Sequence, residues 1–180
     1  MPVKNKIEII LLFVIISVIT GCGEGRREPT SKMQYRQGLY YMVNEQDPYT
    51  GIFFEQYKSG QMWEEFACKN GKENGIHKKW HENGQIQYEG ALKDGKKEGV
   101  WKKWYENGQI NEECTYSDGK HNGAYKVWHE NGQIKYEGIF SNGKKEGVWK
   151  IWHANGRYSQ MLCLRNFHSL SKLSLSSCLS

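Results

Sequence analysis

Apolar, aromatic and charged residues are interleaved in short runs along the body of the chain, and glycine-containing turns separate the runs. The run GIHKKWHE from Gly75 to Glu82 and the run QIQYEGAL from Gln85 to Leu92 are joined by Asn83-Gly84. Asn-Gly between two β-rich runs is the strongest short-range hairpin signal, because both residues of a type I′ turn need positive φ. The pattern therefore predicts a β-hairpin with a two-residue turn at Asn83-Gly84.

The hairpin pattern repeats every 24 residues. Glycine keeps this spacing in three columns, and aromatic residues repeat between them. A supersecondary unit repeated at a fixed spacing predicts a linear array in which each unit packs on its neighbours. The predicted fold class is all-β, an elongated, twisted antiparallel sheet of tandem β-hairpin repeats. We expect structural turns at Gly51, Gly60, Gly75, Gly84, Gly99, Gly108, Gly123, Gly132 and Gly147.

The predicted two-residue turn also fixes which residues face each other across a hairpin. Its register pairs His81 with Ile86, and it places opposite charges face to face in three successive repeats: Lys78 with Glu89, Lys102 with Glu113 and Lys126 with Glu137. Exposed pairs of this kind each contribute only about 0.2 to 1 kcal/mol. We interpret them as markers of register on a solvated face.

The opposite face is expected to carry most of the aromatic bulk. One hairpin cannot bury such a face alone, whereas stacked hairpins can lay aromatic rows over glycine rows, where missing side chains leave space. The residues predicted to form a candidate binding face are Trp101, Tyr105, Tyr125, Tyr136 and Trp149.

Residues 1–21 have the pattern of an export signal, with basic Lys4 and Lys6 ahead of an apolar run from Ile9 to Ile19. The run is about half the ~20 residues that a spanning helix needs, so an uncleaved transmembrane anchor is the alternative. The segment ITGC that ends at Cys22 resembles the lipobox of bacterial lipoproteins. This resemblance implies lipidation of Cys22 by fatty acids such as palmitate, and a place in the cell envelope. Gly23 after the cysteine implies the outer membrane if the cell has two membranes. Residues 22–34 are predicted to be a flexible tether.

The repeat domain is predicted to span residues 35–156 and resembles the MORN repeat variant of bacterial proteins labelled YwqK family antitoxins. The resemblance rests on PYTG at the start of the array, on ENGQI in three copies and on GKKEG in two. It implies a twisted sheet of successive hairpins that binds or scaffolds, and it supplies no catalytic residues. The pattern stops after Gly156, so residues 157–180 are either a divergent cap or the product of a frameshifted reading frame.

No constellation for catalysis, metal binding or a cofactor is recognised. His81, His129 and His153 share one column, but equivalent strands lie about 9.5 Å apart, too far for a shared zinc ion. Cys68 and Cys114 are expected to be small apolar residues of the stack, and Cys163 with Cys178 is an optional disulfide. Most of the formal net charge of +5 lies in the leader and tail, which argues against a nucleic-acid partner.

A repeated surface behind an export signal favours a non-catalytic, envelope-anchored scaffold over an enzyme, because an active site is a unique constellation. The expected partner is a protein or a glycan that meets the aromatic face. The alternative is an antitoxin or immunity protein that neutralises a toxin.

The lipidation hypothesis predicts the behaviour of a Cys22→Ala variant. Loss of the thiol should abolish labelling by a fatty-acid probe and release the protein from the membrane fraction. If the variant stays membrane-bound and the wild type takes no label, the apolar run is an uncleaved anchor instead.

Overall fold

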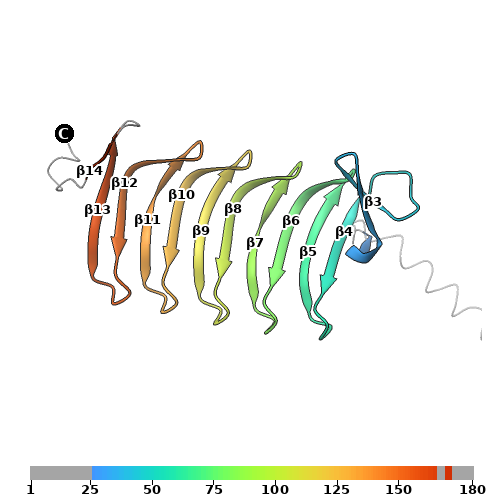
Figure 1. The fold of residues 1–180 in the computed structure, drawn as a ribbon, viewed down its shortest axis with the longest axis horizontal. Coiled ribbons are helices and arrows are strands. Elements are labelled where there is room, and N and C mark those ends of the chain that lie inside the picture. Colours follow the sequence, from blue (N-terminus) through green and yellow to red (C-terminus); the bar gives the residue numbers. More distant parts are fainter. Residues whose placement is uncertain (1–25, 166–168, 172–180) are drawn as a thin grey trace, which may run out of the picture.

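The computed structural model describes residues 26–165 and 169–171. Their main feature is one sheet of twelve strands, in which the order from β4 to β14 follows the chain and β1 is added at the edge beside β4. The strands of the array are β4 (Gly51–Gln56), β5 (Met62–Lys69), β6 (Lys72–Trp80), β7 (Ile86–Lys93), β8 (Lys96–Trp104), β9 (Ile110–Ser117), β10 (Lys120–Trp128), β11 (Ile134–Ser141), β12 (Lys144–Trp152), β13 (Tyr158–Arg165) and β14 (Ser169–Ser171). Figure 1 shows these hairpins following one another along the long axis in a single layer. The predicted fold class is confirmed.

The sheet has a row of turns along each of its two long sides, and the two rows differ in turn type. Both residues of Asp94-Gly95 have positive φ, at 50° and 79°, and equivalent turns follow β5, β9 and β11. Along the other side, the Gly84 N–H donates to the His81 carbonyl at 2.9 Å and the His81 N–H donates to the Gln85 carbonyl at 2.8 Å. Gly84 has φ of +82°, whereas Asn83 is not among the residues with positive φ. This geometry is a three-residue hairpin loop that ends in a left-handed glycine.

The predicted two-residue turn at Asn83-Gly84 is therefore wrong. The register shifts between Lys79 and Trp80, so that Trp80 rather than His81 pairs with Ile86. Beyond the shift the predicted charge pairs are confirmed: Lys78 with Glu89, Lys102 with Glu113 and Lys126 with Glu137.

Many of the glycines predicted to form turns lie inside strands instead. Gly60, Gly84, Gly108 and Gly132 do lie in turns, whereas Gly51, Gly75, Gly99, Gly123 and Gly147 belong to β4, β6, β8, β10 and β12. The register shifts opposite Gly75, between Phe66 and Cys68 of β5, and similar shifts recur along the array. Gly75 has φ of +120°. The extra residues of a β-bulge can require a positive φ of this kind. The periodic glycine marks a bulge here and not a chain reversal.

One row of side chains crosses the sheet and forms the centre of its core. The cross-strand partners in this row are Phe53, Phe66, His77, Gly90, Trp101, Cys114, Tyr125, Gly138, Trp149 and Leu162. From His77 onward, larger residues alternate with smaller ones. A Cβ built on Gly90 would lie 2.2 Å from the Trp101 ring, and one on Gly138 would lie 2.3 Å from the Trp149 ring. The expected packing of aromatic rings over glycine is confirmed at both positions.

The folded part begins earlier than predicted. β1 (Arg27–Pro29) pairs with β4 in parallel, a short 3-10 turn (Thr30–Lys32) follows, and β2 (Met33–Arg36) pairs with β3 (Leu39–Met42) in a separate hairpin. The Tyr49 hydroxyl donates to the Arg26 carbonyl at 2.7 Å. Residues 27–29 and 33–34 are thus held by strand pairing, with a 3-10 turn between them, and residues 27–34 are not a flexible tether.

The sheet also continues past the predicted boundary at residue 157. β13 pairs with β12 in the register of the earlier hairpins, with Val148 opposite Cys163 and Trp152 opposite Tyr158. Backbone pairing with β12 tolerates the changed side chains, so the divergence in sequence does not end the fold. Cys163 is disulfide-bonded; Cys178, its predicted partner, lies outside the described residues, as do the export signal and Cys22. In the described part of the chain, no helix is long and apolar enough to cross a membrane.

The size alternation of the core row predicts a specific rescue. Gly90→Cys should lower the thermal midpoint and cost about 1 to 3 kcal/mol, because the new Cβ enters the space of the Trp101 ring. Adding Trp101→Tyr recreates the natural pair Cys114 and Tyr125 of the next repeat, and should restore most of the loss. A double variant less stable than Gly90→Cys would contradict this account of the core.

Candidate binding site

Two members of the predicted binding face are core residues. Trp101 and Trp149 are only 5% and 2% exposed, because their rings cover glycines and are flanked by other aromatic side chains. Lys97 Nζ lies 4.2 Å from the centre of a Trp101 ring and covers it further. These two tryptophans cannot offer their faces to a partner, so this part of the prediction is wrong.

Tyr125 and Tyr136 are partly buried and stack on each other, with ring centres 5.9 Å apart and planes inclined by 24°. Tyr125 also packs on Trp149 at 5.8 Å. Tyr125 belongs to the core row, and Tyr136 extends it towards the three-residue turns. Tyr105, the fifth predicted residue, lies apart from this stack in the turn after β8.

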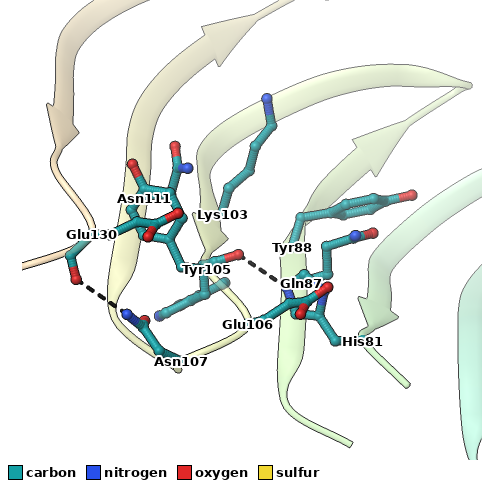
Figure 2. Close-up of a pocket in the computed structure, with 10 residues that line it drawn as sticks. His81, Gln87, Tyr88, Lys103, Tyr105, Glu106, Asn107, Asn111 and Glu130 are labelled. Atoms are coloured by element: carbon teal, nitrogen blue, oxygen red, sulfur yellow. Dashed lines mark hydrogen bonds and ion pairs between the residues drawn. The ribbon is translucent and has the colours of Figure 1, made fainter. Parts of the chain in front are cut away.

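Tyr105 lines a groove at the three-residue turns, which Figure 2 shows in close-up. The groove encloses about 680 Å³, within the usual size of a ligand site. Three successive hairpins supply its lining, which combines carboxylates, amides, a lysine and aromatic edges: His81, Gln87, Tyr88, Lys103, Trp104, Tyr105, Glu106, Asn107, Asn111 and Glu130.

Hydrogen bonds between repeats fix the walls of this groove. The Tyr105 hydroxyl donates to the Trp128 carbonyl at 2.7 Å, and the Asn107 amide donates to the Glu130 carbonyl at 3.1 Å, drawn as a dashed line in Figure 2. The same bonds occur one repeat earlier, where His81 Nε2 donates to the Trp104 carbonyl at 3.1 Å. Each turn is thus tied to the next one along the array.

The sequence contains a signal for these bonds that the histidine column alone does not reveal. The column that holds His81, His129 and His153 also holds Tyr57 and Tyr105, and both residue types can donate to a carbonyl from a similar distance. Tyr57 donates to the Trp80 carbonyl at 2.7 Å, and His129 Nε2 lies 3.2 Å from the Trp152 carbonyl. His81 and His129 therefore have structural roles, as donors to the next repeat. No group of metal-binding side chains occurs among the residues that the structure describes.

A second groove occupies the equivalent place nearer the start of the array. It encloses about 730 Å³ and is lined by Glu55, Gln56, Tyr57, Lys58, Ser59, Gln61, Trp63 and Glu82. Tyr57 and Glu82 stand where Tyr105 and Glu130 stand in the other groove. Trp63 takes the place of Asn111, however, and Lys79 Nζ lies 4.2 Å from the centre of its ring. The two grooves share a framework and differ in chemistry.

Tyr88, which lines the first groove, also belongs to a polar cluster beside it. The Tyr88 hydroxyl donates to Glu64 at 2.8 Å, and His77 Nε2 lies 3.0 Å from the same carboxylate oxygen. The hydrogen bond from His77 lowers the pKa of the Glu64 carboxyl, so the group is ionised at neutral pH. Burial raises the pKa of Tyr88, and it also raises the pKa of Tyr105. Both hydroxyls remain protonated donors at neutral pH.

The two cysteines of the stack are inert by the same reasoning. Cys68 and Cys114 are free and buried, as expected. Burial raises the pKa of each thiol to about 11, so neither is a thiolate at neutral pH.

The repeated hairpin is also what comparison with known proteins detects. A family model described as the MORN repeat variant matches residues 73–94, 97–118 and 122–142. Three consecutive repeats match this family. Each MORN-type match spans one hairpin with its three-residue turn at the centre, so the units are β6–β7, β8–β9 and β10–β11. No curated protein matches the chain.

The bonds between turns predict the effect of changing Tyr105. Tyr105→Phe should lower stability to urea by about 1 kcal/mol, because it leaves the Trp128 carbonyl without its donor. Tyr105→His should recover most of this loss, since histidine makes the equivalent bond at His81 and His129. Equal stability of the wild type and the phenylalanine variant would show that the bond adds nothing.

Proposed function

We propose that the protein is a non-catalytic scaffold of the bacterial cell envelope, anchored by lipid on Cys22, that binds a protein partner in the grooves at its three-residue turns. The observation that carries the proposal is the recurrence of an open, polar groove at equivalent positions of the array. A surface that repeats along a rigid sheet suits an extended partner.

The charge of the groove rim indicates the kind of partner. Glu82, Glu106 and Glu130 occupy the same position of three successive turns, and the Glu106 side chain is 84% exposed. Adjacent repeats are two strands apart, which spaces these carboxylates by about 9.5 Å. An extended peptide in the polyproline II conformation rises about 3.1 Å per residue and turns once every three residues, so basic residues at every third position would lie on one side and match the rim. We infer an extended, basic segment as the bound element.

The lipid anchor would place these grooves at the membrane surface. The lipobox-like segment before Cys22 supports this location, and the short path from Cys22 to β1 would hold the array close to the bilayer. Partners are therefore expected among envelope proteins. The resemblance to YwqK family antitoxins adds a toxin to the candidate partners.

The rim predicts which charges the partner needs. Glu106→Gln with Glu130→Gln should weaken partner capture about fivefold, because each exposed ion pair contributes roughly 0.5 kcal/mol. The matched control, Asp94→Asn with Asp118→Asn, removes the same charge from the opposite turns, where the chain itself uses Asn70 and Asn142. Capture is measured by cross-linking in intact envelopes, followed by mass spectrometry of the polypeptides that are recovered.

Three outcomes would overturn this proposal. Equal recovery by both double variants would show that the rim does not bind. Recovery of glycan in place of polypeptide would transfer the site to a carbohydrate ligand. A growth defect on deletion of the gene that disappears when a neighbouring gene is also deleted would favour the antitoxin function.

A further inference from the structure

The face of the sheet opposite the core row carries an apolar stripe that solvent reaches. Each of four hairpins contributes one cross-strand pair: Ile76 with Ala91, Val100 with Thr115, Ala124 with Ile139, and Val148 with Cys163. Cys163 is buried at one end of the stripe, and Glu98 and Glu146 stand opposite Ala91 and Ile139 between hairpins. Ile76, Val100, Ile139 and Val148 are 53%, 49%, 56% and 40% exposed. Exposed apolar side chains that recur at the same position of successive hairpins mark an interaction site more often than singly scattered residues do.

A charge ladder runs beside the stripe on the same face, two residues away from it in each strand. Successive rungs alternate in sign across eight strands: Glu65, Lys78, Glu89, Lys102, Glu113, Lys126, Glu137 and Lys150. Each rung is directly opposite its neighbour, and ion pairs form within the sheet, such as Lys102 with Glu113 at 3.4 Å. Both signs are thus held in fixed order on one face of the sheet.

This order is self-complementary. A two-fold axis parallel to the strands turns a second copy face to face with the first and reverses the order of its strands, while each row stays over the same row. Reversing an alternating row with an even number of rungs exchanges the sign at every rung. Lys102 then faces Glu113 of the second copy, and Ile76 faces Ile139 of the second copy. A slip by one strand would place like charges together, which disfavours that register.

We propose that this face binds a second copy of the chain, so that two sheets pack through their apolar stripes with antiparallel charge ladders. Burial of the stripes drives association, and the ladders select orientation and register. The contact surface covers eight strands about 4.8 Å apart. It is three rows wide, with rows about 6.8 Å apart that hold the stripe, the ladder and Trp80 with its equivalents. The resulting footprint is roughly 750 Å². That area is close to the about 800 Å² that each partner buries in a stable complex.

The pairing leaves the groove framework unused. The stripe and the ladder have no residues in common with either groove, and Trp104 is the one tryptophan of the Trp80 row that also lines a groove. A dimer would therefore present two sets of grooves. The inference therefore does not rest on the proposed function.

Inversion of the whole ladder tests the proposal with its own control. The inverted chain carries Lys at the four Glu rungs and Glu at the four Lys rungs, which keeps net charge and the alternation within each sheet. Full chains with two different tags are co-expressed, solubilised in a large excess of detergent and captured through one tag. Wild type should capture wild type, and inverted chain should capture inverted chain. Mixed pairs should be recovered at least tenfold less, because every rung then meets a like charge.

A second pair of variants tests the stripe. Ile139→Asp should reduce capture of the second copy at least tenfold. Val43→Asp, which changes a residue that is 49% exposed and follows β3 outside the stripe, should leave capture unchanged. Circular dichroism checks that each variant keeps its strand content. Mixed pairs recovered as well as matched pairs, or a wild-type chain that is monomeric by light scattering, would overturn the proposal.

Discussion

A sheet with a single layer has to bury its apolar side chains among neighbours on the same face, and this constraint governs the rest of the structure. A two-layer protein shields a tryptophan from above. Here Trp101 is shielded by lying flat on Gly90, with Tyr88 and Tyr116 packed around it. Close approach of a ring to the backbone requires glycine beneath it. The residue across the strand from that glycine must then be large enough to fill the space in the row. Where Cys114 replaces glycine, the facing residue is the smaller Tyr125.

The same constraint explains the bonds between repeats. Neighbouring hairpins have no second layer that holds them in place, so bonds at the turns add to the strand pairing and the side-chain rows that join them. At one end the glycine of each two-residue turn donates to the repeat before it, as Gly95 does to the Glu73 carbonyl at 2.8 Å. At the other end Tyr105 and its equivalents bond to the repeat after. Rows of turns held in this way keep a fixed spacing, and the two grooves lie at equivalent places two repeats apart.

The sequence predicts the array because its period and its charge columns are repeated several times. The pairing of Lys78 with Glu89 and the packing of rings over glycine could both be derived in this way. The turn type at Asn83-Gly84 could not, because Asn-Gly also fits a three-residue loop in which only Gly84 has positive φ. A glycine column alone likewise does not distinguish a turn from a bulge, as Gly75 shows. The candidate site was harder to predict, because whether an aromatic residue is covered depends on what lies across the strand. Trp101 and Tyr105 are both aromatic residues of the same repeat. Trp101 is in the core, however, whereas Tyr105 lines a groove that three hairpins form together.

Repetition also bears on how a self-complementary face can persist as an array changes length. Each MORN-type hairpin adds one Lys rung and one Glu rung, as Lys102 and Glu113 are added by β8 and β9. Adding or removing a whole hairpin therefore keeps the number of rungs even, and the reversed row still meets opposite charges at every position. A ladder with one charge per hairpin would lack this property, because its reversed copy would present the same sign throughout. The pairing of opposite charges within one repeat, which stabilises the hairpin only slightly, is thus sufficient to make a face complementary to itself at any length.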